Sequence, residues 1–261
     1  MMRIALVSFN PLWEDKLGNI HRVESLLQKV VSLGADYVVF PEMTLTGFSM
    51  NSVALGEPLE NSETLKHFQY VASSLGLNII FGMITKQDGN YYNTCMALNK
   101  TGQIEAYYDK VHPFSFSGED QYYAAGDRLS SVGWPGGWGL TVCYDLRFPE
   151  LYQALSFHNM ILINIASWPE KRIHHWHSLL VARAIENQSF MIGVNRTGSD
   201  GNGLSYIKSS TIISPEGQIL SPVKTNKEID VYEINIENAE QFRKDFPVKK
   251  DRKTEFYKDI I

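Results

Sequence analysis

The sequence predicts an α/β fold, because apolar stretches with strand spacing and helix spacing alternate along much of the chain. Residues 3–9 are typical of a buried strand, and residues 20–33 then place apolar side chains at helical intervals before Gly34. A short apolar run at residues 37–40 ends at Pro41 and predicts a second strand. This order favours a mixed sheet with helices packed on its outside.

The same two spacings continue through the rest of the chain. Helices are expected at residues 62–75, 149–157 and 173–187. Strands are expected at residues 78–85, 91–98, 104–108, 140–143, 160–165 and 190–194. Asp88-Gly89-Asn90 predicts a hairpin turn, and Pro215-Glu216-Gly217 predicts another between two strands that precede a charged tail. Without a repeat or a linker, we expect one domain over residues 1–261.

The composition indicates a globular protein of a reducing compartment. Hydrophobic residues make up 44% of the 261 residues and charged residues 20%, close to the average for globular domains. The net charge of −5 argues against nucleic acid or an anionic membrane as a partner. The N-terminus lacks the features of a signal peptide, and two cysteines do not make a disulfide framework, so we expect a cytoplasmic protein. The basic residues at 249–253 are interrupted by Asp251 and predict a solvated tail.

One of the two cysteines lies where a reactive thiol is expected. Cys143 follows an apolar strand and precedes a predicted helix, a place where backbone N–H groups favour an anion and can lower a thiol pKa. The N–H of Tyr144 is then a candidate donor to an oxyanion. A lone cysteine is more often a buried structural residue, and we assign that role to Cys95, which lies in the middle of a strand.

Three charged residues are candidate partners of this thiol. Glu42 comes just after a buried strand, and a carboxylate at the rim of an apolar core suits a general base. Lys110 follows another strand and can place a fixed positive charge beside a developing oxyanion. Glu119 lies in the irregular, aromatic-rich stretch 110–130, which we expect to pack inward. Each of these residues, taken alone, is also compatible with an ordinary surface charge.

Other kinds of site are disfavoured. The histidines within residues 174–177 share one predicted helix but lack the H-E-x-x-H arrangement of a zinc site. The glycines within residues 198–203 lack the spacing of a phosphate-binding loop. We therefore expect neither a metal nor another cofactor.

Taken together, the motifs resemble the nitrilase, or carbon–nitrogen hydrolase, superfamily. The resemblance is carried by Phe40-Pro41-Glu42, by Tyr108-Asp109-Lys110-Val111-His112 and by Val142-Cys143-Tyr144-Asp145-Leu146-Arg147-Phe148-Pro149-Glu150, in the family's order of Glu, Lys and Cys. It continues through residues 182–187 and into Phe246-Pro247-Val248. The resemblance implies a four-layer α-β-β-α sandwich that assembles as a homodimer or a larger homo-oligomer.

Within the superfamily the chain looks like the bacterial omega-amidases. The carriers are the motifs at residues 114–119, 167–169, 195–198 and 200–203. The resemblance implies hydrolysis of an omega-amide of a 2-oxo dicarboxylic acid, of the 2-oxoglutaramate or 2-oxosuccinamate type. It implies that Glu42 takes the Cys143 proton, that Lys110 and the Tyr144 N–H stabilise the oxyanion, and that Glu119 positions the substrate and supports Lys110.

A substrate of this kind carries a carboxylate, which a guanidinium binds well. Arg172 follows the Trp168-Pro169 turn and is the candidate for this role, with Phe116 and Trp168 as further substrate contacts. Arg147 lies four residues after the nucleophile, where we expect a structural ion pair.

Three alternatives stay open from the sequence. The chain is also compatible with another enzyme of the same chemistry, acting on a different amide, a carbamoyl amine or a nitrile. A catalytically idle scaffold or binding protein with this fold is the second alternative, which the intact Glu-Lys-Cys set disfavours. The third is a glutaminase module that supplies ammonia to a partner, disfavoured because no synthetase domain accompanies it.

Overall fold

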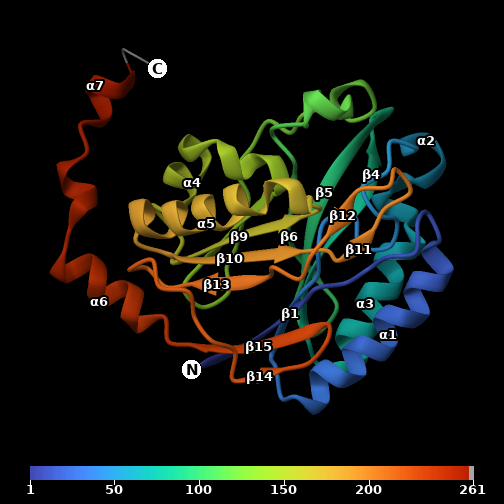
Figure 1. Cartoon of the computed structure of the whole chain (residues 1–261), viewed down its shortest axis with the longest axis horizontal. Coiled ribbons are helices and arrows are strands. Elements are labelled where there is room, and N and C mark those ends of the chain that lie inside the picture. The colour runs from blue at the N-terminus through green and yellow to red at the C-terminus, as the bar shows by residue number, and fades with distance from the viewer. Residues whose placement is uncertain (259–261) are drawn as a thin grey trace.

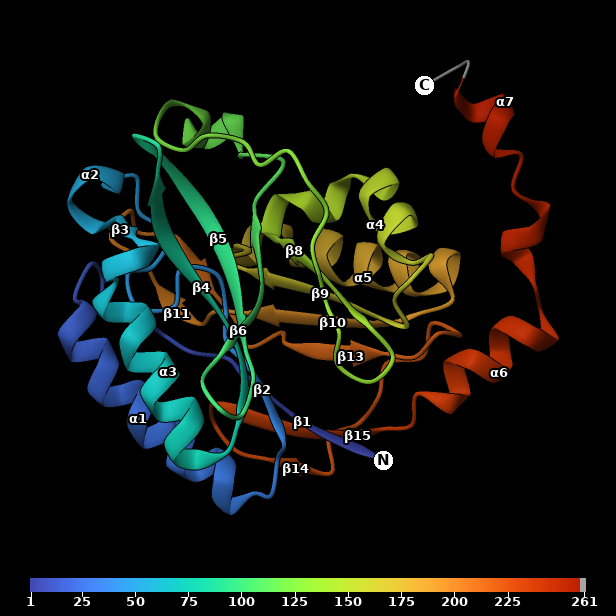
Figure 2. The same ribbon diagram turned by 180° about the vertical axis from the view of Figure 1, so that it is seen from behind.

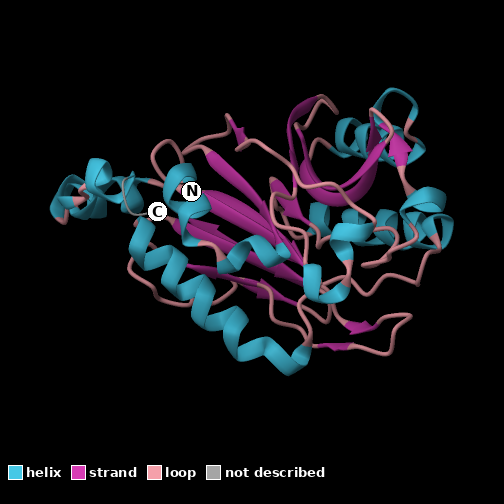
Figure 3. Cartoon of the chain, turned by 90° about the horizontal axis from the view of Figure 1, so that it is seen from above, coloured by secondary structure: helices cyan, strands magenta, loops and turns pink. Residues whose placement is uncertain are grey.

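Two sheets pack face to face in this protein, and helices cover the outer side of each (Figure 1). The computed structural model describes residues 1–258, so the last residues of the expected domain 1–261, residues 259–261, lie outside the described part. The covering helices are α1 (Lys16–Ser32) and α3 (Glu63–Leu75) on the first sheet, and α4 (Pro149–Leu155) and α5 (Ile173–Asn187) on the second. The expected α-β-β-α sandwich is confirmed, and Figure 3 shows its strands between flanking helices.

The first sheet is mixed. Its strands in spatial order are β14 (Lys224–Thr225), β15 (Ile229–Ile234), β1 (Met2–Val7), β2 (Tyr37–Val39), β4 (Asn78–Gln87), β5 (Asn90–Leu98) and β6 (Ile104–Asp109), with β3 (Glu57–Pro58) beside β4. Strands β1, β2 and β4 run parallel, and β4, β5 and β6 form an antiparallel meander that Figure 2 shows from behind. The predicted turn between β4 and β5 is confirmed, since Asp88 and Gly89 both have the positive φ that a tight hairpin requires (47° and 81°).

The second sheet has a parallel centre. Its strands in spatial order are β13 (Thr211–Ile213), β10 (Phe190–Asn195), β9 (Ile161–Ala166), β8 (Trp138–Val142) and β7 (Ser131–Val132). Strands β8, β9 and β10 are parallel. A small separate pair, β11 (Gly198–Ser199) and β12 (Ser205–Tyr206), follows β10. Short helices lie at α2 (Ser52–Leu55), α6 (Glu237–Asp245) and α7 (Thr254–Lys258).

The core follows from the alternation of side chains along the strands. In β1, Ile4 and Leu6 face the second sheet, whereas Ala5 and Val7 face α1 and α3. Strand β9 has helices on one face and the first sheet on the other, so every one of its residues is buried. Full burial of each large apolar side chain stabilises the fold by about 1.5–3 kcal/mol.

The structure corrects two expectations for the last quarter of the chain. The turn at residues 215–217 is present, but the two strands expected to flank it do not form a hairpin. Among the described residues a single bridge, Ile213 to Ile219, spans the turn. Strand β13 instead pairs with β10, and β15 pairs with β1 in the other sheet. The charged tail is helical in part and docks on the body. Arg243 donates to backbone oxygens of Gln188 and Asn159, and Lys249 donates to Ser156.

The part of the chain that the structure describes contains no helix both long and apolar enough to cross a membrane.

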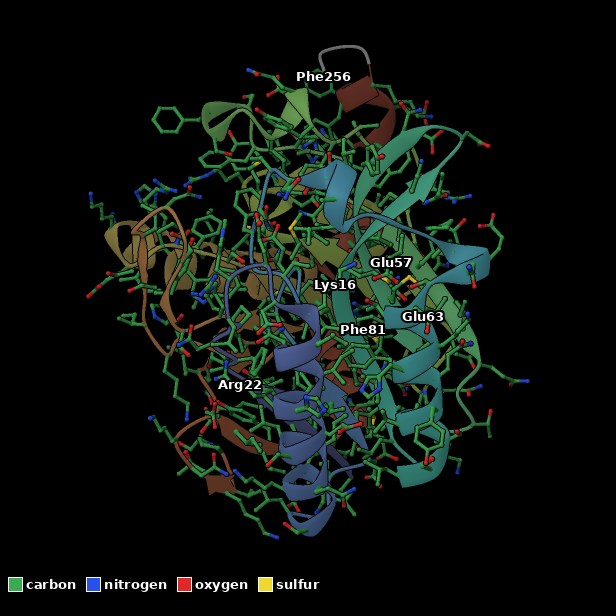
Figure 4. The ribbon with its side chains drawn as sticks, turned by 90° about the vertical axis from the view of Figure 1, so that its right-hand side faces the viewer. Lys16, Arg22, Glu57, Glu63, Phe81 and Phe256 are labelled. Atoms are coloured by element: carbon green, nitrogen blue, oxygen red, sulfur yellow. The ribbon has the colours of Figure 1, made fainter. Side chains whose placement is uncertain are left out.

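Glu57 joins three elements at one end of the first sheet. Its carboxylate forms a salt bridge with Lys16 of α1 and accepts hydrogen bonds from Ser62 and from the Thr64 hydroxyl (2.5 and 2.7 Å). It also accepts from the Thr64 N–H (2.9 Å) in the first turn of α3. Figure 4 shows Lys16 and Glu57 close together between the two helices. Burial alone would raise the pKa of Glu57, but these donors together lower it below its ordinary value.

We predict that Glu57→Gln lowers the free energy of unfolding by about 1.5–3 kcal/mol at pH 7, because charge-assisted hydrogen bonds are lost. Since the folded-state pKa of Glu57 is lowered, its contribution is complete above the unfolded pKa and is lost as pH falls through the folded value. Chemical denaturation of both proteins at pH 7 and at about pH 3 measures this. A difference that stays constant with pH would contradict the assignment.

Candidate active site

Glu42 lies just beyond β2, at the end of the sheet where its parallel strands finish. Its side chain is fully buried. Oε1 accepts hydrogen bonds from Asn93 Nδ2 (2.7 Å) and Lys110 Nζ (3.2 Å), and Oε2 accepts from the Ser167 N–H (2.8 Å). A Cβ at Gly82 would lie 2.4 Å from the Met43 nitrogen, so this glycine allows the segment to pack on β4. The Glu42 carboxylate is therefore held by donors from both sheets, Asn93 and Lys110 from the first and Ser167 from the second.

Lys110 directly follows β6, and its backbone N–H donates to the Asn93 oxygen across the strand pair (2.9 Å). Its side chain is only 1% exposed. Nζ lies 3.2 Å from Glu42 and 2.8 and 3.0 Å from the two oxygens of Glu119. Burial alone would lower the pKa of Lys110, but Glu119 and Glu42 together raise it above its ordinary value. Lys110 is therefore a fixed cation.

Glu119 brings the irregular segment after β6 into the site, as expected. The segment folds into two short 3₁₀ helices, Ser115–Ser117 and Glu119–Gln121, and the Glu119 side chain is completely buried. Besides Lys110, the carboxylate accepts hydrogen bonds from Asn93 Nδ2 (2.9 Å) and from the Phe114 N–H (2.6 Å). Glu119 therefore fixes both Lys110 and the loop that forms one wall of the site.

Asn93 is a site residue that the sequence analysis missed. Its buried side-chain amide donates to both Glu42 and Glu119, so it bridges the two carboxylates opposite Lys110. Its Oδ1 is buried without a hydrogen-bond partner among the described residues. The sequence did contain a signal for this residue, because Asn93 shares a strand with the apolar run Cys95 to Leu98. A polar side chain buried in such a strand requires a hydrogen-bond partner.

Cys143 begins the 3₁₀ helix Cys143–Arg147 directly after β8, with a φ of 45° that is rare for a residue with a side chain. Burial raises the pKa of its thiol well above the ordinary value; Glu42 raises it further, and Lys110 opposes the shift. The expectation that its position lowers this pKa was therefore wrong, because burial and the nearby carboxylate outweigh the backbone N–H groups. A thiol whose pKa is raised in this way requires a base when it attacks.

Asp145 fixes the turn that carries Cys143. Its buried carboxylate accepts from the Val142 N–H (2.9 Å) and from the Tyr108 hydroxyl (2.8 Å). It also contacts the backbone N–H and the ring Nδ1 of His112 (3.0 and 2.8 Å). Because Tyr108 and His112 flank Lys110 in sequence, one carboxylate ties the turn of Cys143 to the segment of Lys110. Asp145 belongs to the motif around Cys143, but its role in holding this turn was not predicted from the sequence.

A small cavity of about 60 Å³ opens onto Cys143 and Lys110. Its wall consists of Phe48, Lys110, Phe114, Ser117, Cys143, Tyr144, Arg147, Ser167, Trp168, Pro169, Arg172, Leu204 and Tyr206. Larger hollows of about 450 and 770 Å³ lie against the C-terminal helices and contain none of these residues. Pockets for drug-sized ligands measure about 300–1,000 Å³, so the cavity suits a compact substrate.

The structure places Trp168 and Arg172 on this wall, as predicted, but not Phe116. The Phe116 side chain is 86% exposed and contacts the ring of Phe114 from outside (5.8 Å between centroids). Phe114 lines the cavity instead, because the short 3₁₀ helix turns neighbouring side chains to different sides. The expectation that Phe116 faces the site is therefore corrected, since Phe114 lines the cavity in its place.

The expected ion pair of Arg147 was also wrong. Within residues 1–258 no carboxylate lies within salt-bridge distance of its guanidinium, which instead lies 4.9 Å from the ring centroid of Trp168 and 5.8 Å from that of Tyr144. Arg172 is likewise stacked, 5.4 Å from the ring of Phe114. The cavity wall therefore carries two guanidinium groups over aromatic rings.

In the part that the structure describes, no three His, Cys, Asp or Glu side chains gather in a way that could hold a metal ion.

The arrangement places a thiol and an ammonium group on one small cavity, with the Glu42 carboxylate hydrogen-bonded to that ammonium group behind the wall. This combination can remove a proton from a nucleophile, stabilise an oxyanion and return the proton to a leaving group. The Tyr144 residue follows the thiol directly, and its ring lines the same cavity.

Comparisons with known proteins agree with this chemistry. Residues 3–244 match the family model described as carbon-nitrogen hydrolase. The chain is 32% identical to an omega-amidase from Escherichia coli, over 96% of each protein, and 31% identical to a 2-oxoglutaramate amidase from Bacillus subtilis, over 97% of this chain and 98% of that protein. A CN-hydrolase superfamily structure from Xanthomonas campestris, with an arsenic adduct in its active site, superposes with a TM-score of 0.89 at 31% identity, covering 96% of this chain and 97% of that one.

We predict that Cys143→Ala abolishes hydrolysis and that Cys95→Ala retains most of it. Cys95 is fully buried between the sheets, where burial raises the pKa of its thiol, whereas Cys143 opens onto the cavity. Alkylation by iodoacetamide, located by peptide mass spectrometry, should therefore mark Cys143 first. Circular dichroism of both variants controls for folding. Equal loss of activity in two folded variants would remove the distinction between the cysteines.

Proposed function

The chain belongs to the carbon–nitrogen hydrolase family and is a cysteine amidohydrolase, and we propose that it acts on a short amide whose far end carries a carboxylate. The proposed substrate is an omega-amide of a 2-oxo dicarboxylic acid, of the 2-oxoglutaramate or 2-oxosuccinamate type. The products are the dicarboxylic acid and ammonia.

The observation that carries this proposal is the pair of guanidinium groups on the cavity wall. Arg147 and Arg172 line the same small cavity as Cys143, and both are stacked on aromatic rings rather than paired with acids of the described chain. The rest of the wall is largely apolar, so an anion there would meet these cations in a partly dry environment. Guanidinium groups bind carboxylates through short, charge-assisted hydrogen bonds. The names of the two curated relatives support the same substrate class.

In the proposed first half-reaction, Glu42 takes the Cys143 proton as Sγ attacks the amide carbon. The carbonyl oxygen becomes an oxyanion, which Lys110 and the Tyr144 N–H stabilise; such donors are typically worth about 3–4 kcal/mol of barrier. Glu42 then gives its proton to the nitrogen, the C–N bond breaks and ammonia leaves. The acyl group remains on Cys143 as a thioester.

In the second half-reaction, Glu42 takes a proton from water, and the resulting hydroxide attacks the thioester carbon. The same donors stabilise the second oxyanion before the C–S bond breaks and the acid leaves. The Cys143 sulfur recovers its proton from Glu42. The raised thiol pKa supports this scheme, because an uncharged thiol requires a base for each acylation. Glu119 and Asn93 hold Lys110 and Glu42 in place throughout.

We predict that Arg172→Ala lowers kcat/KM for 2-oxoglutaramate by about tenfold to thousandfold, because a carboxylate that loses its guanidinium costs about 1.5–4 kcal/mol. Hydrolysis of an uncharged aliphatic amide should change much less. Lys171→Ala is the matched control, since it removes an exposed positive charge next in sequence. Ammonia release from a panel of amides, carbamoyl amines and nitriles measures both effects.

Each outcome separates one part of the proposal from the rest. A wild type that prefers the uncharged amide would contradict the omega-amidase assignment. A wild type that prefers the anionic amide, with Arg172→Ala keeping that preference, would contradict only the role of Arg172. A protein that releases no ammonia from the whole panel would favour an idle scaffold.

A further inference from the structure

Among residues 1–258, the guanidinium of Arg147 has one polar contact beside its aromatic neighbours, and it is to a histidine. Nη2 of Arg147 lies 3.3 Å from Nδ1 of His175, in the first turn of α5. A guanidinium has only donors and remains charged, so the ring nitrogen in this hydrogen bond must be the acceptor. His175 is therefore neutral in this arrangement and carries its proton on Nε2.

We propose that His175 is a positioning residue, which in its neutral form holds the Arg147 guanidinium against the cavity wall to receive the carboxylate of the substrate. The inference rests on the proposed function, because it gives Arg147 a share in binding the anionic end. His175 does not itself line the cavity, so it acts through Arg147.

The geometry explains why such a holder is needed. Trp168 and Tyr144 fix the plane over which the guanidinium lies, at 4.9 and 5.8 Å, but a stacked guanidinium still slides and rotates. Since no acid of residues 1–258 forms a salt bridge with Arg147, the hydrogen bond to His175 sets its direction. A long side chain fixed in advance loses less conformational entropy when the substrate binds.

The charged and titratable groups around His175 oppose its protonation. They are His174 on its own helix, Arg147 from the 3₁₀ helix 143–147 and Arg172 from the 3₁₀ helix 170–172. Partial burial, then these three groups, lower the pKa of His175 below its ordinary value. The imidazole therefore accepts from Arg147 at neutral pH and loses this ability only as pH falls through the lowered pKa.

Protonation changes the contact in a defined way. Nδ1 then carries a hydrogen and cannot accept from Arg147, and two adjacent cations repel each other. The carboxylate subsite should lose its geometry, while Cys143, Glu42 and Lys110 are unaffected. Acid should therefore raise KM for an anionic amide more than for an uncharged one.

The test compares His175→Gln, which keeps a hydrogen-bond acceptor but does not titrate, with His175→Leu, which removes the acceptor. His174→Gln is the matched control, because it removes the neighbouring exposed imidazole. For each variant and the wild type, KM and kcat are measured for 2-oxoglutaramate and for an uncharged amide between about pH 5.5 and about pH 8.

We expect the wild-type KM for the anionic amide to rise about three- to tenfold from neutral to acidic pH, since a charge-assisted contact is weakened. His175→Leu should show the raised KM at every pH, with kcat close to wild type. His175→Gln should keep the low KM without the acidic rise. His174→Gln should keep the low KM at neutral pH and the acidic rise, with the rise moved toward higher pH because one group that lowers the pKa of His175 is removed. Kinetics on the uncharged amide report any folding defect.

An unchanged KM in His175→Leu, or the same acidic rise in His175→Gln, would overturn the positioning role while leaving the proposed function intact. A wild type without preference for the anionic amide would overturn both, and this is seen before any variant is made. If His175→Leu fails to fold, the pH profile of KM in His175→Gln decides whether His175 has the positioning role.

Discussion

The buried cluster of Lys110, Glu42 and Glu119 is the interaction on which the rest of this site depends. All three side chains are shielded from water. An unpaired charge in such a buried place is strongly destabilising, so each of the three requires the other two. Asn93 bridges the two carboxylates and leaves little freedom in their positions. The first sheet supplies these residues from the ends of β2 and β6 and from β5, and the loop after β6 closes around them. The groups proposed for catalysis are therefore also structural groups, and their geometry exists before a substrate arrives.

The same cluster determines the state of the nucleophile. Two carboxylates face one ammonium, so the field at Cys143 does not favour a thiolate, and burial of the thiol acts in the same direction. We therefore assign the proton to sulfur at rest, with Glu42 as its acceptor only when an electrophile is present. The segments that follow strands of the second sheet contribute Cys143, the guanidinium groups of Arg147 and Arg172, and the rings of Tyr144 and Trp168. One sheet thus holds the groups that we propose for acid–base chemistry, and the other holds the proposed nucleophile and the guanidinium groups to which we assign the substrate carboxylate.

Much of this arrangement could be predicted from the sequence, because strand ends are visible in the apolar pattern. Glu42, Lys110 and Cys143 each follow such a strand, and the structure brings them together. Contacts between distant segments were not predictable in this way. Arg147 and His175 are 28 positions apart and meet only in the folded chain. Similarly, β15 belongs to the first sheet because it pairs with β1, at the other end of the chain. In the irregular loop after β6 the apolar residues have no regular spacing that indicates the direction of each side chain. The sequence therefore favoured Phe116, whereas Phe114 lines the cavity.

Measurement of the thiol pKa decides whether Cys143 is an uncharged thiol that depends on Glu42. Ultraviolet absorbance of the thiolate can be followed against pH in a Cys95→Ala background, with Cys95→Ala/Cys143→Ala as the blank. We expect no thiolate signal at neutral pH, and a lower thiol pKa when Glu42→Gln removes the negative charge. A thiolate already present at neutral pH, or a thiol pKa that Glu42→Gln leaves unchanged or raises, would contradict this expectation.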